Sequence, residues 1–225
     1  MKIIKNIQLD IPEDTGRDFL KKLMGGRMIP RMEEMLAQKR AETIDALDPR
    51  AVYNAFRIKD IQGDSVFFES GYIFKGPNIS KILTGSEKAV IFIFTLGENI
   101  EKLAKTQKDS GDTLGTIIVD ALTTSMLTLT GEYVGRIIKE EYLDREGYGA
   151  TCTYSPGQYK WTIEEQKEIF SMVDGSRIGV ELNQSCLMVP FMSVSGVYGL
   201  GPEDKINKTR VACDLCPREN CISRR

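Results

Sequence analysis

The sequence predicts an α+β protein with a twisted, mostly antiparallel sheet and flanking helices. Stretches with apolar residues at helical spacing alternate with short β-branched and aromatic runs. Two of these runs flank a hairpin signal at Gln62-Gly63-Asp64. With 225 residues, 41% of them hydrophobic, the chain is long enough to bury one sizeable core. We therefore expect a single domain over residues 1–225, with a helical N-terminal part at 1–47 and a cysteine-bearing tail at 202–225.

The individual elements follow from the same patterns. The N-terminal part should hold two helices, one over 13–24 and one from Ile29, separated by Gly25-Gly26. We interpret the methionine-rich face of the second helix as core packing. The other expected elements are strands at 51–58, 66–68 and 89–94, a long helix at 112–146, a helix at 162–173 that opens with a capping box, and two strands within 180–200 around Pro190.

Charge and histidine content exclude several classes of function. The formal net charge is −2, from 30 Lys+Arg against 32 Asp+Glu, so there is no electrostatic basis for nucleic-acid binding. The chain has no histidine, which excludes histidine acid–base catalysis and histidine metal ligands. It also excludes a corrinoid carrier that ligates cobalt through its own histidine.

No segment of the sequence predicts a membrane span or a signal peptide. The longest apolar run is 89–94, whereas a spanning helix needs roughly 20 apolar residues. The N-terminus lacks the apolar core of a signal peptide. We therefore expect a cytoplasmic protein with no membrane partner.

The C-terminal cysteines form the most specific chemical motif. Of five cysteines, three stand within the last 13 residues, as Cys213, Cys216 and Cys221 in a C-x2-C-x4-C pattern. The two-residue gap lets two thiolates of one turn face the same ion, as in zinc knuckles and iron–sulfur loops. The pattern therefore predicts a metal centre, and its spacing leaves both zinc and an iron–sulfur cluster open.

A tetrahedral metal centre needs a fourth ligand. Cys186 is the first choice, because it begins a predicted strand pair that the returning tail could cover. Cys152 is the second choice, and a carboxylate or an exogenous ligand are the remaining options. The alternative interpretation is three unligated thiols on a solvated tail, since a disulfide is less favoured in a cytoplasmic protein.

Two short blocks carry a resemblance to a known family. They are Ser155-Pro156-Gly157 and, about 40 residues later, Ser193-Val194-Ser195-Gly196-Val197-Tyr198. In this order they resemble the S-adenosylmethionine-binding activation domain of cobalamin-dependent methionine synthase. The segments 48–53 and 161–166 and the terminal cysteines are more similar to short stand-alone homologues of that domain.

The resemblance implies the fold of that activation domain and a site for S-adenosylmethionine beside a corrinoid held by a partner. In the family, an electron reduces cob(II)alamin and the methyl group then traps the cobalt as methylcobalamin. Carried over by motif, the donor site would include Ser155, Gly157 and Tyr198, with an acidic residue from the long helix, Glu132 or Asp120. A Pro-Gly turn lets a nucleoside approach the backbone closely, and a carboxylate suits the methionine ammonium.

Two positions depart from the family's pattern. Thr153 stands where the family has an arginine suited to the donor's carboxylate, and Gln158 stands where a tyrosine usually follows the glycine. Without the guanidinium a strong charge-assisted contact is lost. The resemblance covers roughly 40–225 and is most specific over 151–201.

The sequence and this resemblance together predict an accessory protein that takes part in reductive reactivation or docking of a corrinoid-dependent methyltransferase. Its partner would be a corrinoid-binding protein or a methyltransferase of a methionine synthase-type system. In this hypothesis the terminal cysteine cluster could pass the electron. The alternative is a non-catalytic binding module with a structural zinc and a lost S-adenosylmethionine site.

Overall fold

The computed structural model describes residues 1–146, 148–209 and 212–219, and its centre is a sheet of seven strands. The strand order is β4-β3-β2-β5-β9-β6, with β1 beside β2, and these neighbours all pair antiparallel. The strands are β1 (Lys2–Ile4), β2 (Arg50–Gln62), β3 (Ser65–Phe68), β4 (Ile73–Lys75), β5 (Lys88–Thr95), β6 (Tyr148–Ala150) and β9 (Ser193–Pro202). A separate hairpin joins β7 (Glu181–Leu182) to β8 (Met188–Val189). The predicted α+β class with an antiparallel sheet is confirmed.

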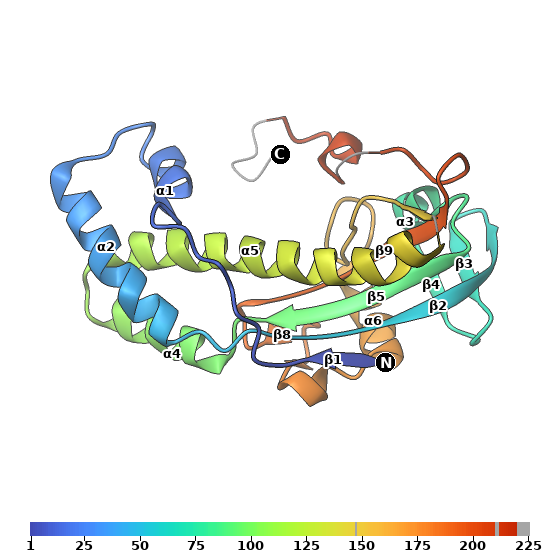
Figure 1. Cartoon of the computed structure of the whole chain (residues 1–225), viewed down its shortest axis with the longest axis horizontal. Coiled ribbons are helices and arrows are strands. Elements are labelled where there is room, and N and C mark those ends of the chain that lie inside the picture. Colours follow the sequence, from blue (N-terminus) through green and yellow to red (C-terminus); the bar gives the residue numbers. More distant parts are fainter. Residues whose placement is uncertain (147, 210–211, 220–225) are drawn as a thin grey trace.

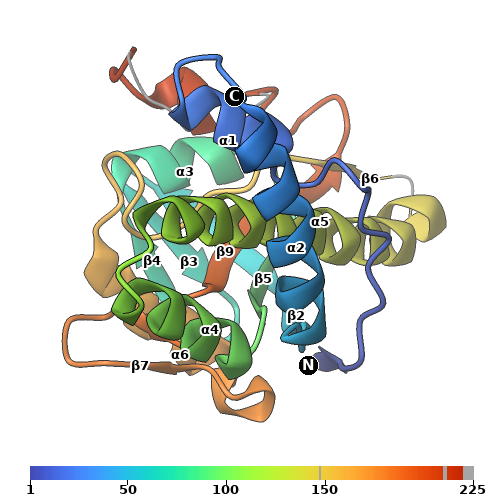
Figure 2. The ribbon, with the colours of Figure 1, turned by 90° about the vertical axis from the view of Figure 1, so that its left-hand side faces the viewer.

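Helices cover the sheet and extend beyond it. They are α1 (Arg17–Leu23), α2 (Pro30–Asp45), α3 (Pro77–Leu83), α4 (Glu98–Asp109), α5 (Thr113–Glu146) and α6 (Gln166–Met172), with 3-10 turns η1 (Ile163–Glu165), η2 (Gly175–Ile178) and η3 (Ala212–Leu215). The long α5 crosses the molecule above β5 and β9 (Figure 1). Its N-terminal half packs among α1, α2 and α4 (Figure 2).

The apolar composition of α5 is explained by this packing. By length and composition alone Thr113–Leu143 could cross a membrane, a criterion that the core helix of a globular protein also meets. In this fold Leu122 and Met126 pack in the helical end of the molecule. Val134 and Ile138 pack on the sheet. The helix is therefore apolar because it joins two cores.

The central strand β5 is buried on both faces, which explains its continuous apolar run. Ile91 and Ile93 pack in one core with α3, α6 and Trp161. Phe92 and Phe94 pack in the core beneath α5. The sheet is thus the middle layer of three. The strands β5 and β9 contribute side chains to the cores on both of its faces.

Most predicted elements form, and the differences have local causes. The hairpin around Gly63, the buried strand at 89–94 and the long helix are confirmed. The helical N-terminal part also holds β1. The region 180–200 forms three strands rather than two, because the Asn183 side chain accepts hydrogen bonds from the backbone of Ser185 (2.9 Å) and Leu187 (3.0 Å) and closes an extra hairpin. Thr162 opens a 3-10 turn and makes no side-chain cap bond.

Candidate functional site

The two blocks that carry the family resemblance meet in space at one edge of β9. Tyr154 and Val197 exchange two backbone hydrogen bonds of 2.8 Å each. Further along the edge, Thr151 N donates to Gly199 O at 3.0 Å. The chain therefore follows β9 from β6 as far as Tyr154 and then turns away. We call residues 154–158 together with 193–197 the turn–strand junction.

The turn at Ser155-Pro156-Gly157 is closed by both backbone and side chain. Gln158 N donates to Ser155 O at 3.1 Å, and Gly157 has a φ of 90°, in the left-handed region that favours glycine. In return, Ser155 N donates to the side-chain Oε1 of Gln158 at 3.0 Å. Gln158, which departs from the tyrosine of the family's pattern, thus closes the turn with its own side chain.

Gly196 lets the turn lie directly against the strand. A Cβ at this position would lie 2.7 Å from Phe92 Cζ and 3.1 Å from Ser155 Oγ, so any side chain would displace one of them. On the other face of β9, Ser195 Oγ donates to the buried Oε1 of Gln166 at 2.7 Å. The Ser-Gly pair is therefore fixed from both sides of the sheet.

Two buried aromatic rings support the junction. Tyr154 and Trp161 are each 1% exposed and stack with centroids 5.8 Å apart and an interplanar angle of 10°. The Tyr154 hydroxyl accepts from Asn78 Nδ2 at 3.1 Å and donates to the carbonyl of Tyr159. Burial raises the pKa of Tyr154, which keeps the phenol a hydrogen-bond donor. The turn is thus a rigid platform.

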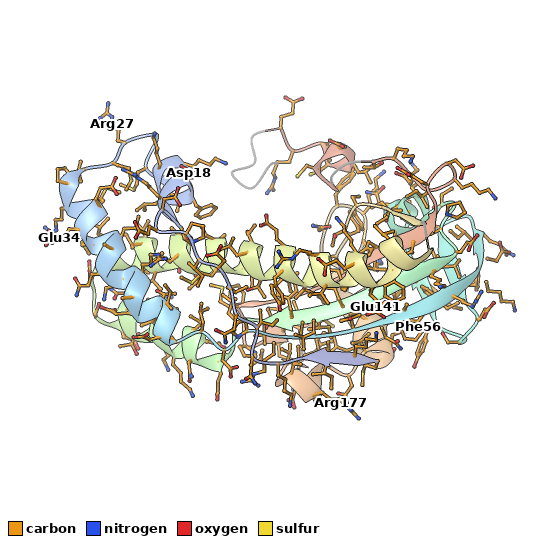
Figure 3. All side chains as sticks on the ribbon, in the orientation of Figure 1. Asp18, Arg27, Glu34, Phe56, Glu141 and Arg177 are labelled. Atoms are coloured by element: carbon orange, nitrogen blue, oxygen red, sulfur yellow. The ribbon has the colours of Figure 1, made fainter. Side chains whose placement is uncertain are left out.

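Tyr198, predicted to contact the donor, is buried beneath α5. Side chains alternate along β9, and Tyr198 points into the same core as Phe92. It is 3% exposed, and its hydroxyl finds no hydrogen-bond partner among the described residues. Nearby, Tyr53 donates to Glu141 at 2.8 Å, and Figure 3 shows Glu141 on the sheet side of α5. Burial raises the pKa of Tyr198. A contact with a ligand would therefore require the end of α5 to move.

The structure separates the two acids considered for the donor's ammonium group. Glu132 is exposed on α5, one residue after Gly131, whose Cβ would lie 3.1 Å from Phe94 Cζ. Phe94 pairs with Val194 of the junction, so Glu132 stands at the level of the junction along the helix. Asp120 lies roughly 18 Å earlier along α5 than Glu132. Partial burial raises its pKa and the charge of Lys108 opposes that rise, so Asp120 belongs to the helical end of the molecule.

The predicted metal ligands are not gathered into one site. In the described part of the chain, no group of three Cys, Asp or Glu side chains could hold a metal ion as arranged. Cys213 and Cys216 are half-buried at η3, and Cys221 lies outside the described residues. Cys186 lies in the β7–β8 turn and is 4% exposed. In both Figure 1 and Figure 2 this hairpin lies in the lower part of the molecule and the C-terminal segment lies in the upper part. The described part of the tail therefore does not lie over Cys186, because the hairpin faces α4.

A groove between that hairpin and α4 was not predicted from the sequence. Its volume is about 600 Å³, and it is lined by Arg50, Gly97, Glu98, Glu101, Lys102, Lys105, Ile178, Gly179, Glu181, Val189 and Pro190. Beside it stand Leu187, Val189 and Phe191, which are 46%, 48% and 67% exposed. They come from the end of the β7–β8 turn, from β8 and from the bend at 190–192 that leads into β9. We call this feature the hairpin groove.

The charges of the hairpin groove are mixed and partly paired. Arg50 forms an ion pair with Asp48 and also donates to Ile178 O at 3.3 Å. The hydrogen bond from Arg50 holds the pKa of Asp48 below its usual value. Phe191 N donates to Glu101 Oε2 at 3.2 Å, which fixes the exposed ring at the rim. The groove therefore offers apolar area and both signs of charge, rather than an anion site.

Comparisons with known proteins identify a family and a fold for this chain. A family model for the vitamin B12-dependent methionine synthase activation domain matches residues 79–211, which is more than half of the chain and includes both blocks of the junction. A crystal structure of the MetH reactivation domain bound to AdoHcy has the same fold, with a TM-score of 0.61 and 19% sequence identity over 92% of this chain and 80% of that one. No curated protein matches the chain. The chain belongs to the family of vitamin B12-dependent methionine synthase activation domains.

Proposed function

We propose that this protein binds S-adenosylmethionine at the turn–strand junction and presents its methyl group to a corrinoid held by a partner, in the reductive reactivation of a corrinoid-dependent methyltransferase. The observation that carries the proposal is the close approach of Ser155 to Gly196. It joins the two sequence blocks that carry the family resemblance, and both blocks lie within the matched residues 79–211. The relative bound to AdoHcy supports a ligand of this chemical class.

The residues of the junction are suited to a nucleoside with a charged tail. Gly196 lets Ser155 lie against the strand edge and Gly157 turns the chain there, so a nucleoside would lie along the turn rather than over Gly196, where Phe92 and Ser155 fill the space. The Ser155 hydroxyl is held at that edge, and Glu132 supplies a carboxylate at the same level for the ammonium group. Thr153 supplies no charge for the donor's carboxylate, so the adenosine part must provide most of the affinity.

The hairpin groove is suited to the partner. The exposed row of Leu187, Val189 and Phe191 leads directly into β9. Ser193, at the start of β9, bonds back to Pro190 O at 2.7 Å, which ties the hairpin to the junction. A protein seated on this row would stand beside the donor site. The partner's corrinoid supplies the cobalt that accepts the methyl group, while this chain orients the donor and excludes water.

Calorimetry with S-adenosylhomocysteine tests the donor site. We expect the wild-type protein to bind, and Gly196→Ala to lose the binding heat, because the new methyl group would meet Phe92 and Ser155. Gly135→Ala is the matched control, since a Cβ there has no atom within 4 Å and lies on the same long helix as Glu132. Thermal melts of both variants separate lost binding from lost folding.

Two results would contradict the donor proposal. One is the absence of binding heat for the wild-type protein with both S-adenosylhomocysteine and S-adenosylmethionine. The other is full binding by a folded Gly196→Ala variant, which would place the ligand elsewhere on the molecule.

A further inference from the structure

We infer that Lys160, whose ammonium group lies over the exposed ring of Tyr159, binds the carboxylate on the amino-acid tail of the methyl donor. Given the donor site of the proposed function, on which this inference rests, Lys160 would distinguish a nucleoside with a carboxylate tail from one without it. The residue belongs to neither of the two blocks that carry the family resemblance. It stands in residues 155–161, which we call the platform loop.

Two successive turns place Lys160 beside the donor site. In the first turn Gln158 N donates to Ser155 O at 3.1 Å, and in the second Trp161 N donates to Gln158 O at 2.9 Å. Gly157 N also donates to Trp161 O at 2.9 Å, so the platform loop closes on itself. Lys160 is therefore the direct neighbour of a residue that is hydrogen-bonded to the Pro-Gly turn.

The backbone that carries Lys160 is anchored, while its side chain faces solvent. The Tyr159 carbonyl accepts hydrogen bonds from Asn78 Nδ2 at 2.8 Å and from the buried Tyr154 hydroxyl. Gly76 packs against Lys160 O, which would lie 3.2 Å from a Cβ at position 76. The side chains of Tyr159 and Lys160 are both exposed. Binding residues are commonly placed in this way, on loops that a rigid scaffold positions.

The backbone conformation of Lys160 is one that favours glycine. Its φ is 59°, in the left-handed region that residues with a Cβ rarely adopt. At the matching position of the preceding turn the chain has Gly157, with a φ of 90°. A non-glycine residue held in this region costs free energy, and such residues cluster at binding sites. The lysine in the second turn therefore points to a role for its side chain.

The ammonium group of Lys160 is oriented by an aromatic ring and is available to an anion. Lys160 Nζ lies 5.4 Å from the ring centroid of Tyr159, within the range at which the ring attracts a cation. Lys160 forms no ion pair with another residue that the structure describes. Close to the loop, Glu165 accepts a hydrogen bond from Trp161 Nε1 at 3.4 Å. One cation with a carboxylate nearby suits a singly charged carboxylate better than a multiply charged phosphate.

Lys160 and Glu132 would divide the two charges of the donor's tail. The tail carries an ammonium group and a carboxylate, and Glu132 is exposed at the level of the junction on α5. Lys160 would supply the positive charge that Thr153 does not. Because lysine is a point charge on a flexible stem, it contributes less than a two-pronged guanidinium contact. The adenosine part would thus still provide most of the affinity.

A matched pair of ligands tests the role of Lys160. S-adenosylhomocysteine carries the whole tail, whereas its decarboxylated analogue keeps the adenosine and the ammonium group and lacks only the carboxylate. Calorimetry measures both ligands with the full-length wild type, Lys160→Gln and Lys160→Arg. We expect the wild type to prefer S-adenosylhomocysteine by about tenfold, as for a charge-assisted hydrogen bond near solvent. Lys160→Gln should bind both ligands with equal affinity, and Lys160→Arg should keep the preference.

Two further variants separate this contact from general effects of charge and folding. Lys167→Gln removes one positive charge from an exposed position on α6, and it should keep the wild-type preference. Lys160→Gly should melt no lower than wild type, because glycine accepts a φ of 59°, and yet it should lose the preference. Lost selectivity in a variant of undiminished stability cannot come from unfolding.

The failure of this inference and the failure of the donor site give different results. If the wild type binds S-adenosylhomocysteine and Lys160→Gln keeps the preference, Lys160 does not read the carboxylate and the donor site still stands. Equal binding of the two ligands by the wild type, or loss of the preference in Lys167→Gln as well, would also overturn the role of Lys160. A wild type that binds neither ligand would remove the donor site, and the role of Lys160 with it.

Discussion

The turn–strand junction and the hairpin groove are neighbours that are built in opposite ways. The junction rests on buried aromatic rings and on Gly196, which no larger residue could replace without displacing Phe92 or Ser155. The groove has exposed apolar side chains, with Phe191 67% exposed, and pairs of charges near solvent. The first arrangement gives a small ligand a fixed surface. The second gives a protein partner apolar area without contributing to the core.

The largest expected effect is on the stability of the junction. Trp161→Ala removes a ring that is 1% exposed and contacts both Tyr154 and Phe74. We expect a loss of about 3–5 kcal/mol of unfolding free energy, measured by urea denaturation. The exposed neighbour Tyr159 is the control, and Tyr159→Ala should change the free energy by less than about 0.5 kcal/mol. Equal effects of the two substitutions would show that the junction has no aromatic support.

The next largest effect is expected on the affinity for the partner and not on the stability of the fold. Phe191→Ser should leave the unfolding free energy within about 0.5 kcal/mol of wild type. It should weaken binding to a corrinoid protein loaded with cob(II)alamin by about tenfold or more, as expected for an aromatic residue at the centre of an interface. Surface plasmon resonance measures the affinity. A Phe191→Ser variant that binds as wild type would remove the hairpin groove from the interface.

A smaller effect on stability is expected at Tyr198. The sequence predicted that this residue contacts the donor, whereas the structure buries it beneath α5. The unpartnered buried hydroxyl costs free energy, so Tyr198→Phe should be neutral or stabilising by up to about 1 kcal/mol. Because the ring is covered by α5, the heat of S-adenosylhomocysteine binding should not change. Loss of that heat in a folded variant would instead support a direct contact, and would require α5 to move.

The smallest expected effect is on the pH dependence of stability, and it comes from the ion pair between Asp48 and Arg50 at the hairpin groove. Asp48 has a folded pKa below its ordinary value of 3.8, because Arg50 hydrogen-bonds to its charged form. A lowered carboxyl pKa stabilises the fold above the unfolded pKa, and that contribution is lost as pH falls through the folded pKa. Arg50→Ala should therefore weaken the acid dependence of stability below about pH 4, in thermal melts. An unchanged pH profile would show that the pair contributes nothing measurable, as for many exposed ion pairs.

Much of the fold and part of the site could be predicted from the residues. The run at 89–94 and the hairpin around Gly63 are local signals, and the structure confirms both. The family blocks placed Ser155, Gly157 and Tyr198 in one donor site, and in the structure Ser155 lies against Gly196 whereas Tyr198 is buried beneath α5. The run and the hairpin could be predicted because each depends on the backbone demands of a short segment.

The remaining features depend on tertiary packing that no short segment specifies. Tyr198 lies inside the fold because β9 has helices on both faces, so neither of its sides is open to solvent. Cys186 faces away from the tail because an Asn183 turn makes the hairpin. The hairpin groove was missed although Leu187, Val189 and Phe191 alternate in the sequence, since an alternating row is equally typical of a strand that faces a core.

An amide NMR titration with S-adenosylhomocysteine compares the two regions in a single experiment. If the donor lies at the turn–strand junction, the amides of Ser155, Gly157, Ser195 and Gly196 should shift with one dissociation constant, while Gly97 and Gly179 in the hairpin groove should stay in place. Shifts confined to Gly97 and Gly179, or no shifts at saturating ligand, would contradict a methyl-donor site at the junction.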